Sequence, residues 1–123
     1  MNKTHSVTFI MTIQYKNQGV NLTDTATTNV LTCPTDATIL IKQIQINNGS
    51  TGGVNFTVQV TDTSAGATFR IFNQSLTGAA TVDIISQTLN LEAGDILKMT
   101  AGTANEIQGI VSYALLDRSQ ENG

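Results

Sequence analysis

The chain has 123 residues, of which 12% are charged, and its formal net charge at pH 7 is −3. This is the length of one domain, and the six basic residues stand singly along the sequence. The composition therefore excludes a protein that binds nucleic acid or an anionic membrane through a basic patch.

Threonine is unusually frequent, with 20 copies in the chain. It is β-branched and favours strands whose outer face is half-exposed. No stretch of ten or more residues has the spacing of a helix. Because the strands carry few charges, their edges are weakly protected against pairing with other chains. The composition predicts an all-β protein whose sheet edges are covered by partner proteins.

The N-terminal third predicts a polar arm followed by two extended segments. Residues 1–6 are polar, and we expect them to form a flexible arm. Apolar and polar residues alternate over Val7–Tyr15, which predicts the first strand. Lys16–Gly19 has the composition of a turn. A second extended segment starts at Val20 and stops before Pro34, which cannot donate to a central ladder.

The segment Ile39–Asp62 predicts two strands joined by a turn. Every second side chain of Val54–Thr61 is apolar, which is the period of a strand with one buried face. In the preceding arm the alternation slips by one residue at Lys42-Gln43, and a β-bulge there would restore the inward face. Between the arms, Asn47–Gly53 is rich in Asn and Gly, which predicts a hairpin with a long mobile tip.

The second half of the chain predicts further short strands. The last of them, Ile107–Leu116, is apolar on both faces toward its end, so we expect it to be internal or capped by a partner. Together the segments predict a single-domain antiparallel β-sandwich, jelly-roll-like, with eight or nine short strands. The sandwich is expected over residues 7–116, with a polar C-terminal tail at 117–123.

No residue set predicts catalysis, a cofactor or a metal. His5 lies in the arm without an orienting carboxylate near it in sequence, and Cys33 is expected to be a buried apolar group. The carboxylates could supply calcium ligands, but they occur one per turn, so turn capping is the favoured interpretation. The acidic residues concerned are Asp24, Asp36, Asp62, Asp83, Glu92 and Asp95. The six aromatic residues are expected in the core, which weakens a carbohydrate-binding role.

Several motifs resemble those of small virion proteins of tailed bacteriophages. They are a Cys-Pro pair in Leu31–Pro34, the two strands of Ile39–Asp62, Leu-Asn-Leu-Glu-Ala-Gly-Asp-Ile-Leu-Lys in Leu89–Lys98, and a final strand with Ser-Tyr-Ala-Leu in Ile107–Leu116. The Leu-x-Leu-x-x-Gly-Asp-x-Leu pattern also occurs in trimeric jelly rolls of the C1q and TNF type. The resemblance implies a β-sandwich that binds the head, neck or tail surface in many copies.

The resulting hypothesis is a non-enzymatic capsid decoration, or cement, protein. It would be made in the host cytoplasm, form a homo-oligomer, most simply a trimer, and bridge major capsid protein subunits on the virion surface. The contacts predicted for it are Thr4, His5 and Ser6 in the arm, and Asn48, Gly49 and Ser50 in the loop. Two alternatives are a neck or tail accessory protein and a receptor- or glycan-binding module that uses loops Asn47–Gly53 and Thr61–Gly66.

Overall fold

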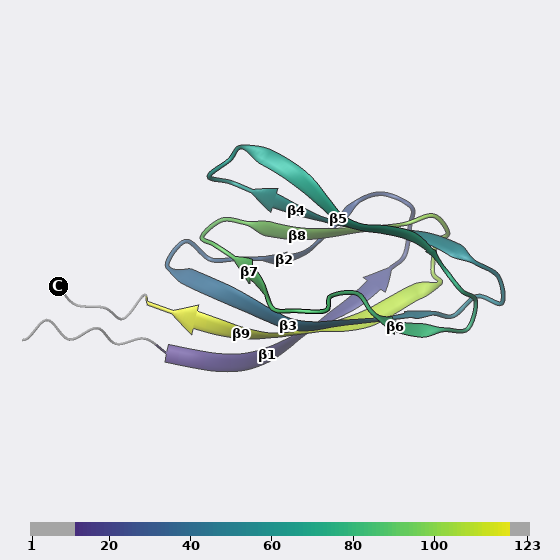
Figure 1. The fold of residues 1–123 in the computed structure, drawn as a ribbon, viewed down its shortest axis with the longest axis horizontal. Coiled ribbons are helices and arrows are strands. Elements are labelled where there is room, and N and C mark those ends of the chain that lie inside the picture. Colours follow the sequence, from purple (N-terminus) through teal and green to yellow (C-terminus); the bar gives the residue numbers. More distant parts are fainter. Residues whose placement is uncertain (1–11, 119–123) are drawn as a thin grey trace, which may run out of the picture.

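The protein is an antiparallel β-sandwich, as the sequence predicts (Figure 1). The structure, a computed structural model, describes residues 12–118. Over these residues the chain forms nine strands: β1 (Thr12–Leu22), β2 (Thr28–Thr32), β3 (Ala37–Asn48), β4 (Val54–Asp62), β5 (Ala67–Leu76), β6 (Thr81–Asp83), β7 (Leu89–Leu91), β8 (Ile96–Ala101) and β9 (Ile107–Asp117). In this range no helix is long and apolar enough to cross a bilayer.

The strands form two sheets, and the chain crosses from one sheet to the other several times. The first sheet has the order β1-β9-β3-β6, and β7 also pairs with β3. The second has the order β2-β8-β4-β5. Among the described residues, only β4 and β5 are consecutive strands that pair with each other as a hairpin. β9 lies between β1 and β3, which confirms that the last strand is internal.

The core fills the space between the sheets. On β3, Ile39, Ile41, Ile44 and Ile46 are all buried, although Ile41 and Ile44 are three residues apart. The pairing of β3 with β9 shifts register between Ile41 and Gln43, so Lys42 is the extra residue of a bulge. This confirms the predicted bulge, which keeps all four isoleucines on the inner face.

The predicted hairpin of Ile39–Asp62 is wrong. β3 and β4 lie in different sheets and form no ladder with each other, so the segment between them is an arch from one sheet to the other. Two half-buried strands can bury their apolar faces against each other only from opposite sheets, about 10 Å apart. The tip is also tied down rather than free, because Ala79 N donates to Ser50 O at 2.8 Å.

The predicted turn at Lys16–Gly19 is also wrong. β1 runs without interruption, and its pairing with β9 is regular from Thr12 opposite Asp117 to Leu22 opposite Ile107. The continuous ladder with a long neighbouring strand outweighs the turn-like composition of four residues. The first part of the predicted strand, residues 7–11, and the predicted arm lie outside the described residues.

Candidate interaction surface

The first half of β1 turns its apolar side chains away from the core. Val20 and Leu22 are buried, and since successive side chains of a strand alternate between faces, Ile13 and Tyr15 point to the outer face of the sheet. Their side chains are 53% and 76% exposed. A strand that only served this fold would place apolar residues inward along its whole length. The exposed pair is therefore a candidate contact surface.

Neighbouring strands extend this pair into a patch. Ile13 lies opposite Leu116, and Tyr15 lies opposite Ala114, which in turn pairs with Leu40. Leu40 and Leu116 are half-buried and Ala114 is buried. We call these five residues the apolar patch. Because the side chain of Ala114 is small, the surface of the patch is recessed between Tyr15 and Leu40.

The bulge residue Lys42 reaches across the apolar patch. Its ammonium nitrogen lies 5.2 Å from the centroid of the Tyr15 ring, a distance at which a cation is attracted to the ring face. The bulge therefore has two consequences: it restores the inner face of β3 and it places a cation beside the most exposed aromatic ring of the patch.

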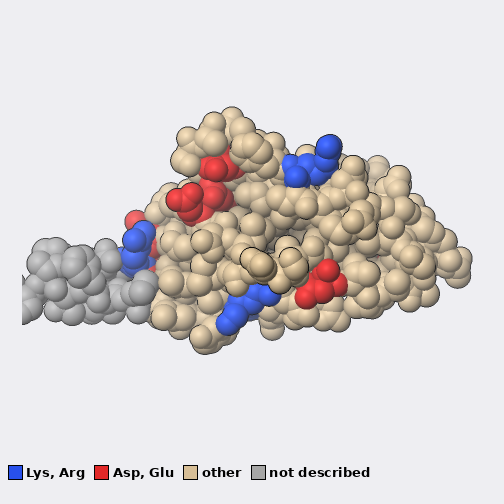
Figure 2. Space-filling model, viewed as in Figure 1, with Lys and Arg blue, Asp and Glu red and all other residues tan. Residues whose placement is uncertain are grey.

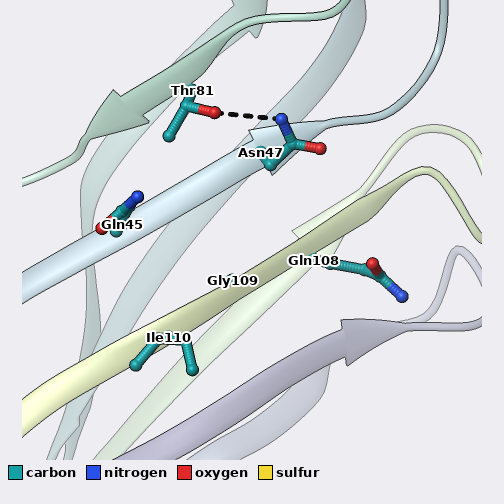
Figure 3. A pocket seen from close by; sticks show the side chains of 6 residues that line it. All are labelled: Gln45, Asn47, Thr81, Gln108, Gly109 and Ile110. Carbon is teal, nitrogen blue, oxygen red and sulfur yellow. Dashed lines mark hydrogen bonds between the residues drawn. The ribbon is translucent and has the colours of Figure 1, made fainter.

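The same sheet face continues into an amide-rich hollow of about 440 Å³ (Figure 3). It is lined by Gln45 and Asn47 of β3, Gln108, Gly109 and Ile110 of β9, and Thr81 of β6. Asn47 Nδ2 donates to Thr81 Oγ1 at 3.0 Å, which fixes one wall. Ile110 is exposed among these amides. The hollow offers hydrogen-bonding groups of both kinds, and its lining contains no carboxylate, imidazole, thiol or amine.

A second exposed apolar site lies at the open edge of the other sheet. Phe69 and Ile71 of β5 are 52% and 41% exposed, and Ile71 is the extra residue where the β4–β5 ladder shifts register. Ile71, Ile84, Ile85 and Leu89, with three polar residues, line a groove of about 280 Å³. We call it the β5 groove. Figure 2 shows one side of the molecule, on which charged side chains are few and most of the surface is uncharged.

The aromatic residues do not all pack in the core, so that prediction is wrong in part. Phe56 is buried, and its ring centroid lies 6.0 Å from that of the partly buried Phe72. Tyr113 is also buried. Tyr15 and Phe69, however, belong to the exposed sites. The exposure of Tyr15 could have been predicted from the sequence. Tyr15 and Val20 are five residues apart on one continuous strand, so their side chains lie on opposite faces of the sheet.

The predicted loop contacts have mixed positions. Asn48 is fully buried, and its Nδ2 donates to the carbonyl oxygens of Gly52 and Leu76 at 3.0 and 3.1 Å. Its side chain therefore holds the arch and does not face a partner. Gly49 is exposed and Ser50 is half-exposed, so their contact role stays a prediction. Thr4, His5 and Ser6 lie outside the described residues.

The buried carboxylate of Asp95 organises two turns. Asp95 Oδ1 accepts hydrogen bonds of 3.0 Å from the backbone N–H and from the hydroxyl of Thr63, and Oδ2 accepts from the Glu92 N–H at 2.9 Å. Carboxylate oxygens of Asp62, Glu92 and Asp95 lie within 4.8 Å of one another. The Asp95 hydrogen bonds favour turn capping as the role of this cluster.

Three titratable groups outside the interaction surface have shifted pKa values, and desolvation raises that of the buried Tyr113 hydroxyl. The Ser64 hydroxyl, together with the Ala65 N–H, holds the pKa of the half-exposed Asp62 carboxyl below its usual value. Cys33 is buried, as predicted. Desolvation, with a smaller contribution from the negative charge of Asp95, raises the pKa of the Cys33 thiol. A raised pKa keeps the thiol protonated and therefore a poor nucleophile at neutral pH.

Comparison with known proteins finds likeness in structure and none in sequence. No family model matches the chain, and no curated protein matches it. A chain in the acidic-stable capsid of Helicobacter pylori bacteriophage KHP30 is 9% identical with a TM-score of 0.55, and the match covers 89% of this chain and 95% of that one. The Drosophila NLP core, described for pentamer formation and histone binding, is 14% identical with a TM-score of 0.54, over 80% and 97%.

A third solved structure with this fold is a capsid chain. The T13 particle of infectious bursal disease virus contains a chain that is 10% identical with a TM-score of 0.54. The match covers 94% of this protein but only 33% of the viral chain, so this protein spans about a third of that relative. At these identities the likeness concerns the fold, which is one that viral capsids use.

Proposed function

We propose that this protein is a non-enzymatic structural component of a tailed-phage virion, and specifically a capsid decoration (cement) protein. The observation that carries the proposal is the apolar patch, whose Ile13 and Tyr15 the described residues leave exposed. The matched chain of the KHP30 capsid is also of nearly equal length, so a sandwich of this size occurs in a phage shell.

The mechanism follows from the added contact area. The apolar patch and the amide-rich hollow form one sheet face with few charges, Lys42 among them, and this face docks across joints between major capsid protein subunits. Binding only the assembled shell stabilises it by mass action, and internal pressure must then break these contacts as well. The loop residues Gly49 and Ser50 and the arm residues Thr4, His5 and Ser6 add contacts at the rim. Assembly as a homotrimer would match local three-fold sites.

Binding to shells from which the protein has been removed tests this function. Purified protein should cosediment with such shells saturably and raise the temperature at which they open. The proposal would be contradicted if no binding were found at protein concentrations up to 100 µM. A Kd of that size corresponds to roughly 5–6 kcal/mol of binding free energy. The copy number per virion separates decoration from the neck or tail alternative, since hundreds of copies indicate the shell.

One observation favours a second candidate, a glycan-binding module. Tyr15 is an exposed aromatic ring on the sheet face that also carries the amide-rich hollow, and exposed rings are what sugar-binding surfaces use. A glycan array tests this candidate. If the protein binds a glycan and Tyr15→Ala abolishes that binding, the role of this sheet face would be receptor binding and not capsid docking.

A further inference from the structure

We propose that the β5 groove is the acceptor for residues 7–11 of a second copy of this chain, so that each copy donates an N-terminal strand and receives one. The inference rests on the proposed assembly role and adds the way in which copies join one another. The occupant is the five-residue stretch Val-Thr-Phe-Ile-Met.

The β5 groove has the properties of a strand acceptor. β5 is the edge of the second sheet, because the order β2-β8-β4-β5 ends there. An edge strand carries unpaired backbone groups along one side, and charges, prolines or a short length usually protect it. β5 is ten residues long, contains no proline and has one charged residue, Arg70. Its exposed Phe69 and Ile71 add apolar surface at that edge.

The donor segment has the matching chemistry. Val7, Phe9 and Met11 alternate with polar Thr8, and Ile10 makes the segment apolar on its other side as well. A strand with apolar residues on both sides needs cover on both. A site between β5 and the isoleucines at 84 and 85 provides it, because the groove lies between Ile71 of β5 and the connection from β6 to β7. Five extended residues span about 17 Å, which is about half the length of β5.

The same copy cannot supply this strand to its own groove. β1 begins at Thr12 on the opposite edge of the first sheet, three strand positions away from β6 and β7. At about 4.8 Å per strand this is about 14 Å, and Met11 must lie within about 3.8 Å of Thr12. Figure 1 shows β1 and β5 along opposite sides of the sandwich. The Met11 end therefore cannot lie in the groove of its own copy, and a segment seated there along its whole length must come from another copy.

Exchange of this kind joins two different surfaces, so it closes into a ring or continues as a filament. A ring of three would give the trimer that the sequence suggests. Each interface then depends on one donor and one acceptor, which can be disabled separately.

The test uses two charged variants of the full-length chain and measures mass by light scattering. Phe9→Asp disables the donor, and Ile71→Asp disables the acceptor without emptying the core, because Ile71 is an exposed bulge residue. Wild type should have three times the chain mass of 13.1 kDa, and each variant should have the monomer mass. An equimolar mixture of the variants should give species of twice that mass, since one intact donor and one intact acceptor remain.

Two matched controls add the same charge elsewhere. Asn2→Asp changes the segment before the donor, and Gln74→Asp changes an exposed residue of β5 away from the groove; both should keep the wild-type mass. The proposal is overturned if wild type is a monomer at all concentrations, if Phe9→Asp keeps the wild-type mass, or if the mixture stays monomeric. A monomer that still binds capsid shells would overturn strand exchange alone, whereas an exchanged oligomer that binds no shell would overturn the decoration role alone.

Discussion

The amide of Asn48 donates a buried hydrogen bond of 3.1 Å to the carbonyl oxygen of Leu76. Asn48 ends β3 in one sheet and Leu76 ends β5 in the other, so a single side chain joins the two sheets at the arch. Its Oδ1 also accepts from Ser50 N at 2.9 Å, which shapes the turn that follows.

Asn48→Ala should lower the free energy of unfolding by about 1–3 kcal/mol, because it leaves buried carbonyl groups without a donor. Urea unfolding followed by far-UV circular dichroism measures this. The matched control is Asn47→Ala, whose hydrogen bonds are exposed and whose cost should be about 0.5 kcal/mol or less. Equal losses for the two variants would contradict the role given to Asn48.

Gly109→Ala should destabilise the protein by about 3 kcal/mol, because a Cβ there would overlap the Gln45 carbonyl oxygen and lie 2.6 Å from Ile46 Cδ1. Gly19→Ala on the adjacent strand is the control, since no atom lies within 4 Å of its Cβ. That change should be neutral or stabilise by up to about 1 kcal/mol. Thermal unfolding of both variants separates a steric effect from a general intolerance of alanine in these strands.

Stability should fall as pH rises above about 8.5, the usual pKa of a free thiol. Burial raises the pKa of Cys33 in the folded state, so the unfolded chain loses the thiol proton first and is favoured. The stabilisation is fully present below the unfolded-state pKa and is lost as pH rises toward the folded-state value. Urea midpoints at pH 7.5 and 9.5 should therefore decrease more for wild type than for Cys33→Ala. A parallel decrease would exclude Cys33 as the cause.

Ile13→Asp and Tyr15→Asp should each weaken binding to capsid shells by at least about 10-fold, because loss of a buried interface anchor commonly costs more than about 1.4 kcal/mol. Folding stability should change by less than about 1 kcal/mol, since both side chains are exposed. Asn29→Asp, an exposed residue of β2 in the other sheet, is the control and should bind as wild type. Unchanged binding by both patch variants would move the docking site away from the apolar patch.

Local periodicity predicted the inner face of the strands well. The slip between Ile41 and Ile44 located the bulge at Lys42, because a period of two allows no other way to keep both residues inside. The burial of Cys33 followed similarly from its neighbours in sequence. These features depend on a few adjacent residues, so the sequence contains the information directly.

The pairing of strands could not be predicted in the same way. β3 and β4 read as a hairpin because both have a half-buried pattern and a Gly-rich segment lies between them. That pattern fits any partner of suitable length, and β9, more than fifty residues away, forms the long ladder with β3. For the same reason the turn-like composition of Lys16–Gly19 was misleading, since pairing with β9 holds those residues in a strand.

The sequence by itself determined that the protein is all-β, that it has eight or nine strands, and which side chains of most strands face inward. These follow from side-chain alternation and turn composition, which are local. The tertiary structure alone decided that β3 and β4 lie in opposite sheets, that Asn48 is buried between them, and that Ile13 and Tyr15 face outward beside Ala114. These depend on contacts between residues far apart in sequence, where the gain from burying one face against another selects the partner.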